Sequence, residues 1–204
     1  MIECIDVVIG AACDVAGPIR ATWIQGVVGM AWSNGAGKST MLRSMLGLLA
    51  VRRGVLRVAG ADPARDPHEV RRCIGWLPDR LEVPEDATGA DLLGLACWAR
   101  GVPRAAALRE CDRFAIGSIL QAPLSSCSLG QRRRIQLAVS LIGAPPVLLL
   151  DEPTVGLDSE GIDRLTQAIL ARGPALTVVA SHDHGWLDQV RAVRWPTPSV
   201  PVGA

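Results

Sequence analysis

The chain has 204 residues, 49% hydrophobic and 20% charged, which is long enough and apolar enough for one substantial core. Its 21 lysines and arginines nearly balance 20 aspartates and glutamates, so a net charge of +1 gives no basis for bulk electrostatic binding to nucleic acid or an anionic membrane. The six cysteines are scattered, with no CxxC pair and no histidine at ligand spacing. We therefore expect reduced cysteines and no zinc site.

No uncharged apolar run reaches the roughly 18 residues that a membrane-spanning helix needs. The best candidate, Ile135 to Leu150, is interrupted by Gln136, Gly143 and a proline pair. The N-terminus lacks a charged start followed by an apolar block, so we expect no signal peptide. The mean hydropathy of +0.27 is nevertheless high, and either a docking surface for a membrane partner or a large buried parallel sheet would account for it.

Strand-like and helix-like segments alternate along the chain, which predicts an α/β fold with a mostly parallel sheet, preceded by N-terminal antiparallel β-strands. Apolar runs at 27–31, 147–150 and 176–180 are predicted as strands, and residues 54–60 alternate as in a half-exposed strand. After the first run, an amphipathic helix is indicated by the spacing of Leu42, Met45, Leu46 and Leu49.

The middle of the chain, from Pro84 to about Leu141, shows helical periodicity and no convincing strand. Thr88 and Asp91 predict a capping box at the start of one helix. Apolar helix faces are predicted at Leu92, Leu95, Ala96 and Ala99, and again at Ile135, Ala138, Val139 and Ile142.

These patterns predict a single domain over residues 1–195. Its core would comprise 1–83 and 142–195, with a helical subdomain at about 84–141. A proline-rich tail at 196–204 is expected to be loose.

A glycine-rich turn, NGAGKST at Asn34–Thr40, joins the first predicted parallel strand to the following helix. Glycines let successive backbone N–H groups face an anion, and the helix dipole adds to the attraction. Lys38 would hold the β- and γ-phosphates of a nucleotide, and the Ser39 hydroxyl would bind Mg²⁺. Taken alone, a glycine-rich turn before an ordinary helix is the alternative.

Two carboxylates, Asp151 and Glu152, follow the buried strand 147–150, at the sheet edge where functional groups gather in open α/β folds. Asp151 would hold Mg²⁺ through water, and Glu152 would accept the proton of an attacking water. The alternative is an ordinary polar turn after a buried strand.

Two further motifs are weaker when taken singly. CSLGQ at Cys127–Gln131 opens a predicted helix, and its serine and glycine could form an anion site or a plain helix cap. Ser181 and His182 follow the strand 176–180, where His182 would contact the γ-phosphate or orient water. A lone histidine is more often structural or solvated.

In their order and spacing, these motifs resemble the nucleotide-binding subunit of ATP-binding cassette (ABC) proteins over roughly residues 23–190. Asn34–Thr40 is similar to the Walker A motif, Leu150–Glu152 to Walker B and Ser128–Gln131 to the signature sequence. Gly156–Asp158 is similar to the D-loop, and Ser181-His182 to the segment with the switch histidine. Ile74–Asp79 resembles the segment that bears the Q-loop.

The resemblance implies a P-loop NTPase fold and an ATP hydrolase that uses ATP and Mg²⁺. Its catalytic residues would be Glu152 and His182, and its metal ligands Ser39, Asp151 and Asp79. The implied ATP-binding residues are Trp32, Ser33, Asn34, Gly35, Ala36, Gly37, Lys38, Ser39, Thr40, Asp79, Ser128, Gly130, Gln131 and Asp158.

The resemblance also implies partners. Two cassettes, in a homodimer or a heterodimer, would close head to tail so that Ser128 and Gly130 of one complete the ATP site of the other. The helical insert would contact a transmembrane permease subunit, with Asp79 at the hinge. The subunit would act in the cytoplasm, peripheral on the inner face of the cell membrane, in a transporter of the exporter type, with no nucleic-acid partner.

The sequence departs from the family pattern at two places in the predicted site. Trp32 stands where the loop pattern has glycine, and Asp79 stands in place of glutamine. The chain has no tyrosine, and residues 1–22 contain no aromatic residue. We therefore predict that Trp23 or Trp32 stacks on adenine, with a core or interface tryptophan as the alternative for Trp23.

Two other functions stay open. A degenerate, weakly active cassette with a regulatory or structural role in a heterodimer is suggested by Trp32 and opposed by Glu152 and His182. A soluble ABC protein acting on DNA or ribosomes would commonly carry a second cassette, a long coiled coil or a basic arm, and we find none of these in the sequence.

Overall fold

The computed structural model describes residues 1–84 and 86–198, so the predicted tail lies largely outside the described residues. Within them the strands are β1 (Ile2–Ile9), β2 (Ala16–Trp23), β3 (Val27–Met30), β4 (Arg53–Val58), β5 (Ile74–Leu77), β6 (Val147–Asp151), β7 (Leu176–Ala180) and β8 (Val193–Arg194). The α-helices are α1 (Lys38–Met45), α2 (Pro67–Arg72), α3 (Gly89–Arg100), α4 (Ala105–Arg113), α5 (Leu129–Leu141), α6 (Ser159–Leu170) and α7 (His184–Gln189).

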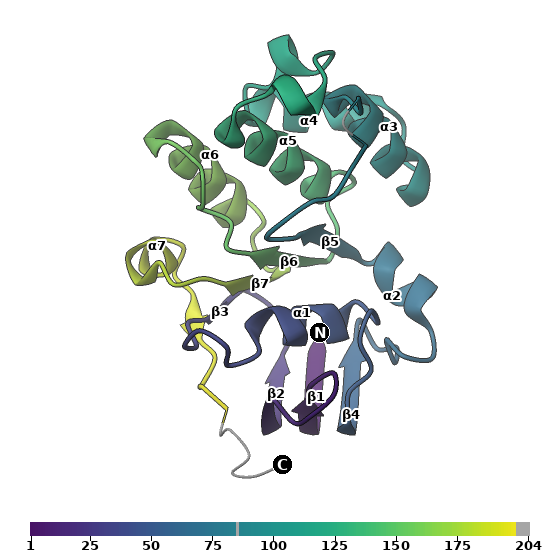
Figure 1. Ribbon diagram of the computed structural model, residues 1–204, viewed down its shortest axis with the longest axis vertical. Coiled ribbons are helices and arrows are strands. Elements are labelled where there is room, and N and C mark those ends of the chain that lie inside the picture. Colours follow the sequence, from purple (N-terminus) through teal and green to yellow (C-terminus); the bar gives the residue numbers. More distant parts are fainter. Residues whose placement is uncertain (85, 199–204) are drawn as a thin grey trace.

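A parallel sheet in the order β5-β6-β7-β3-β8 forms the centre of the molecule (Figure 1). Two of its three inner strands, β6 and β7, are buried along their whole length, as expected for continuous apolar runs covered on both faces. Their register places Asp151 beside Ala180, and Ala180 beside Met30 of β3. The carboxyl ends of three neighbouring strands therefore meet at one edge, and the predicted α/β fold class is confirmed.

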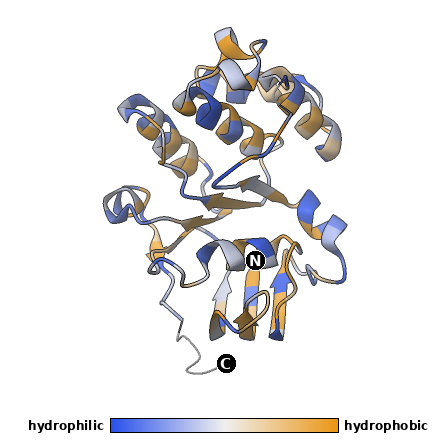
Figure 2. Cartoon of the chain, viewed as in Figure 1, coloured by the Kyte–Doolittle hydropathy of each residue, from blue (hydrophilic) through white to orange (hydrophobic). Residues whose placement is uncertain are grey.

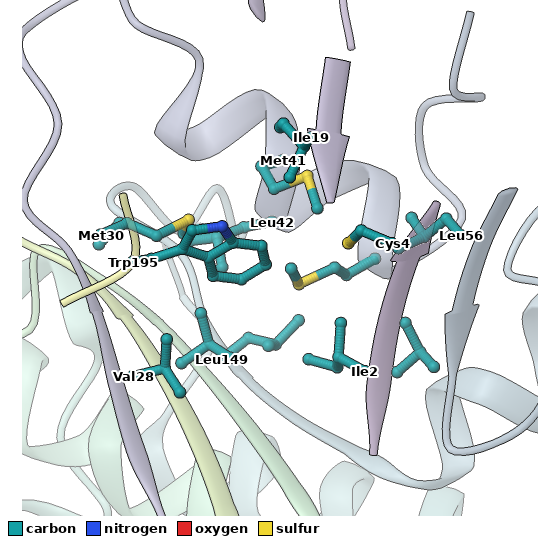
Figure 3. Close-up of a cluster of buried hydrophobic side chains, with 14 of the residues drawn as sticks. Ile2, Cys4, Ile19, Val28, Met30, Met41, Leu42, Leu56, Leu149 and Trp195 are labelled. Atoms are coloured by element: carbon teal, nitrogen blue, oxygen red, sulfur yellow. The ribbon is translucent and has the colours of Figure 1, made fainter. Parts of the chain in front are cut away.

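An antiparallel sheet in the order β2-β1-β4 covers the other side of α1, so that this helix lies between the two sheets (Figure 1). Buried side chains from both sheets and from α1 form one core, with Ile2, Met41 and Leu149 among its members (Figure 3). Helix α1 buries Leu42 and Met45, as the apolar spacing predicted. The phosphate loop is thereby anchored through a helix that is packed on both faces.

The segment between β5 and β6 contains helices and no strand among its described residues, as predicted. Helix α3 begins with the predicted capping box of Thr88 and Asp91. Its apolar face was predicted only in part: Leu92 and Ala96 pack against the core, but Leu95 and Ala99 are exposed and the buried apolar side chains are Leu93 and Cys97. The division into a core and a helical subdomain stays a prediction.

The strands of the parallel sheet are mostly apolar and α2 is polar, whereas the outer helices carry both polar and apolar residues (Figure 2). None of the helices in the described ranges is both long and apolar enough to cross a membrane.

Helix α5 packs directly on the edge strand β5. A Cβ atom added at Gly75 would collide with the backbone carbonyl of Ser140 on α5 and would also crowd Pro145 and Leu148. Because neither backbone can yield cheaply, only glycine fits this crossing between strand and helix.

We predict that Gly75→Ala lowers the free energy of unfolding by about 1–3 kcal/mol, the usual cost of overpacking a close contact. Urea denaturation followed by circular dichroism measures the change. Gly117→Ala is the matched control, since a Cβ at Gly117 meets nothing within 4 Å. Equal stabilities of the two variants would contradict this account of the crossing.

Candidate functional site

A cavity of about 750 Å³ lies at the carboxyl edge of the parallel sheet. It is built from the loop after β3, the end of β6 and its following turn, and the residues after β5 and β7. The lining residues are Ser33, Asn34, Gly35, Gly37, Lys38, Ser39, Thr40, Asp79, Asp151, Glu152, Thr154, Val155, His182 and Asp183. The structure thus brings most of the predicted nucleotide-binding residues, both predicted catalytic residues and all three predicted metal ligands together.

The loop before α1 takes the conformation that its glycines permit. Gly35 has φ 77° and Gly37 has φ 90°, both in the left-handed region. Gly37 is also the N-cap of α1, with no side chain capping the helix. The first N–H groups of α1 are therefore not consumed by a side-chain cap and are available to an anion. Ala36, predicted to bind ATP, is buried and does not line the cavity.

The ammonium group of Lys38 is held in the cavity by two partners. Nζ donates to the backbone carbonyl of Trp32 over 2.8 Å and lies 2.7 Å from Nε2 of His182. Burial lowers the pKa of Lys38, and the charges of Glu152 and Asp151 oppose that shift. Lys38 is therefore a positive charge with little solvent around it and with no carboxylate bonded to it directly.

Asp151 lies at the end of β6 and accepts a hydrogen bond from the Ser39 side chain. Burial raises its pKa, the charges of Asp79 and Glu152 raise it further, and the bond from Ser39 opposes the shift. A hydroxyl next to a carboxylate supplies the hard oxygen ligands that Mg²⁺ prefers, so these residues fit a magnesium ion that would also use phosphate oxygens. No group of three or more His, Cys, Asp or Glu side chains suited to a metal occurs in residues 1–84 and 86–198.

Glu152 adopts a left-handed backbone conformation, with φ 46°, which is strained for a residue that is not glycine. Its N–H donates to the carbonyl of Ala180 over 2.8 Å. Its carboxylate accepts from the backbone N–H of His182 at 3.3 Å, and the other oxygen lies 3.5 Å from Nε2 of His182. The two predicted catalytic side chains are therefore neighbours at the ends of adjacent strands.

Arg133 secures this turn, and the sequence analysis missed it. Its guanidinium donates to the carbonyls of Asp151 and Glu152, each at 2.6 Å, and to the carbonyl of Pro78 at 2.7 Å. Only 4% of Arg133 is exposed, and burial lowers its pKa against the opposing charges of Asp79, Asp151 and Glu152.

A signal for Arg133 existed in the sequence. It stands in the run Arg132 to Arg134, which suggests a solvated face. However, Leu137 and Ser140 follow Arg133 at i+4 and i+7, so all three lie on the same face of α5, and that face is buried.

The prediction that Trp32 stacks on adenine is wrong for this structure. Its side chain is fully buried, its Nε1 donates to the carbonyl of Trp195 over 3.1 Å, and it does not line the cavity. No positive φ occurs at Trp32, so the backbone there does not demand glycine, and the indole points into the core. Trp23 is partly buried against the same core, with its ring 5.7 Å from that of Trp195.

The remaining predicted residues lie outside the cavity of this chain. Ser128 and Gln131 cap α5 with a reciprocal capping box, and Asp158 caps α6 by accepting from the N–H of Gly161. Gly130 lies in the first turn of α5, and its neighbour Leu129 is 60% exposed and leaves no room for a Cβ atom at Gly156. Their predicted role in nucleotide binding stays a prediction.

Comparison with known proteins agrees with this geometry. The daunorubicin/doxorubicin resistance ATP-binding protein DrrA of Streptomyces peucetius is 37% identical over 159 residues, which is 75% of this chain and 48% of that protein. The probable multidrug ABC transporter ATP-binding protein YbhF of Escherichia coli is 33% identical over 144 residues, 69% of this chain and 24% of that protein. The chain therefore spans half or less of the length of these relatives.

Solved structures show the same fold. A structure described as the ATP-binding subunit of an ABC transporter superposes with a TM-score of 0.86 at 25% identity, and the match covers 93% of this chain and 82% of that one. The family model described as ABC transporter matches residues 17–155, which include the phosphate loop and both carboxylates. Because this match spans more than half of the chain and contains the phosphate loop and both carboxylates of the cavity, the chain belongs to the ABC transporter family.

Proposed function

We propose that this chain binds MgATP in the cavity at the carboxyl edge of the parallel sheet and hydrolyses it. The observation that carries the proposal is the convergence of Lys38, Glu152 and His182, with 2.7 Å between the lysine and histidine nitrogens. The loop backbone and Lys38 would bind the phosphates, and a magnesium ion held by Ser39 and Asp151 would offset their charge, with Asp79 as a further ligand.

Glu152 and His182 would perform the chemistry. The Glu152 carboxylate would accept a proton from a water that attacks the terminal phosphate. His182 would contact that phosphate, and the position of its Nε2 beside the ammonium that would bind the phosphate supports this role. The neighbouring positions of these two residues disfavour a degenerate cassette, since both side chains proposed for hydrolysis are present and lie 3.5 Å apart.

The energy of hydrolysis would drive a transporter of the exporter type through a separate transmembrane permease subunit. The printed descriptions of the relatives, a drug-resistance protein and a multidrug transporter protein, support this proposal. Two cassettes would close head to tail, because Ser128 and Gly130 lie outside the cavity of their own chain and would complete the cavity of another. The helical segment at about 84–141 would select the permease. The working location would be the cytoplasmic face of the membrane.

We predict that Glu152→Gln lowers the rate of ATP hydrolysis by about 100-fold or more, which is the usual contribution of a general base. Binding of MgATP, measured by calorimetry, should persist because the phosphate loop is unchanged. Glu160→Gln is the control, since Glu160 lies on the outside of α6, paired with Arg164. Both assays should be run with and without the permease partner, and equal hydrolysis by Glu152→Gln and the wild type would contradict the proposal.

We also predict weak discrimination among nucleobases. None of the six tryptophans nor the single phenylalanine lines the cavity, and Trp76 lines the adjoining hollow that includes Arg43 and Arg80. A stacked base contributes about 1–3 kcal/mol where an aromatic platform exists. We therefore expect the affinities for ATP, GTP and CTP to agree within about fivefold, and calorimetry on the purified chain measures them. A preference for ATP above tenfold would indicate a base contact that this account omits.

A membrane partner should copurify with the chain. We predict that affinity-tagged protein, expressed with its neighbouring genes, retains a polytopic membrane protein in mild detergent. Mass spectrometry of the eluate identifies that protein. Recovery of ribosomal proteins or nucleic acid in place of a membrane protein would favour the soluble, non-transport reading.

A further inference from the structure

Trp32 is tied to distant parts of the chain at two points. It lies where β3 passes into the phosphate loop. Its indole Nε1 donates to the carbonyl of Trp195 over 3.1 Å, across 163 residues of sequence. Its own carbonyl accepts from Nζ of Lys38 at 2.8 Å. One residue therefore links the core below the loop to the ammonium group inside the cavity.

Trp195 is a fixed point for this link. Its side chain is buried, and its backbone N–H donates to the carbonyl of Gly29 on β3 over 2.9 Å. Its ring lies 6.0 Å from that of Trp32, at an interplanar angle of 84°, which is the edge-to-face arrangement that aromatic rings favour. Figure 3 shows Trp195 near Met30 and Leu42, from the strand and the helix on either side of the phosphate loop.

Lys38 needs such a fixed point because its side chain has four rotatable bonds. Its second partner, Nε2 of His182, belongs to a side chain that is about half exposed and free of the core. The Trp32 carbonyl is the buried partner of the two. A packed interior holds its groups in one position. The Trp32 carbonyl can therefore fix the Lys38 ammonium only if the Trp32 side chain is itself fixed in the core.

We propose that Trp32 is a positioning residue for nucleotide binding: the bond from its indole to Trp195 fixes its carbonyl, which in turn holds Lys38 where the phosphates bind. This inference rests on the nucleotide site proposed above and extends it to the core and to Trp195, the residue that follows β8. It assigns the bulky side chain at this loop position a role that glycine could not perform. Displacement of a binding group by about 1 Å is costly, so loss of the indole bond should weaken binding.

The test compares two tryptophans that make the same kind of bond. Trp32→Phe removes the indole donor and keeps an aromatic ring. Trp186→Phe makes the same change in a buried tryptophan whose Nε1 donates to Oγ1 of Thr166 over 2.9 Å, away from the cavity. For each purified variant, thermal unfolding measures stability, and calorimetry measures the affinity for MgATP and for inorganic triphosphate.

Both variants should fold with similarly reduced stability, whereas only Trp32→Phe should bind MgATP about threefold to tenfold more weakly, the scale of one hydrogen bond. Inorganic triphosphate should lose affinity by the same factor, because the effect passes through Lys38 to the phosphates. A purely structural role would lower stability and leave both affinities unchanged.

Three results would overturn the positioning role. They are an unchanged MgATP affinity in folded Trp32→Phe, an equal loss in Trp186→Phe, and a loss confined to MgATP with triphosphate spared. If Trp32→Phe does not fold, Trp195→Phe decides, since it removes the buried indole that fixes the Trp195 backbone, and the carbonyl bonded to Trp32 is then held less firmly. Reduced affinity in that variant supports the proposal and unchanged affinity overturns it. Failure of the wild type to bind any nucleotide would instead remove the proposed function itself.

Discussion

The arrangement of the site depends on the buried ammonium of Lys38, which needs hydrogen-bond partners and a balancing negative charge. Burying a charge is costly unless it is bonded and balanced, and burial lowers the pKa of this lysine. The Trp32 carbonyl and His182 supply its bonds, while the charges of Asp151 and Glu152 supply only a more distant balance. A phosphate group entering the cavity would bring the negative charge that Lys38 lacks. The site is therefore arranged to gain from an anion before any chemistry begins.

The parallel sheet brings the remaining groups to that ammonium, and Arg133 keeps them there. The left-handed backbone of Glu152 costs on the order of 1–3 kcal/mol, and such a conformation persists only where its surroundings enforce it. Two bonds from Arg133 to the carbonyls of Asp151 and Glu152 provide that enforcement. A third bond to Pro78 ties the same guanidinium to the segment that carries Asp79. The Arg133 side chain thus joins α5 both to the turn with Asp151 and Glu152 and to the segment with Asp79.

The sequence predicted the local parts of this arrangement and missed the parts that depend on tertiary contacts. Strand β7 and the capping box at Thr88 follow from patterns within a few residues, and the structure has both. Burial of Arg133 depends on carbonyls that lie 18 and 19 residues away, so its neighbours along the chain concealed it.

Trp32 was misread for the same reason, since its partner Trp195 is 163 residues distant. The prediction for the apolar face of α3 was right for Leu92 and Ala96 and wrong for Leu95, because alanine and leucine occur on both sides of the helix and composition alone could not decide which side is buried. Burial at these positions is decided by contacts with residues far away in the sequence, whereas a periodic pattern reports only on residues within about 18 positions.

The indole at position 32 also bears on whether the cassette has lost its activity. A bulky residue at a position that a glycine usually occupies suggests a blocked loop, but the side chain points away from the cavity and into the core. The conformations that do require glycine, at Gly35 and Gly37, are still supplied by glycine. The two side chains proposed for hydrolysis are also present, with the Glu152 carboxylate bonded to the backbone N–H of His182 and the His182 ring beside Lys38. Glu152 and His182 therefore lie side by side at the ends of adjacent strands, and Arg133 holds the strained backbone of Glu152, a geometry that favours the proposed hydrolysis over a blocked loop.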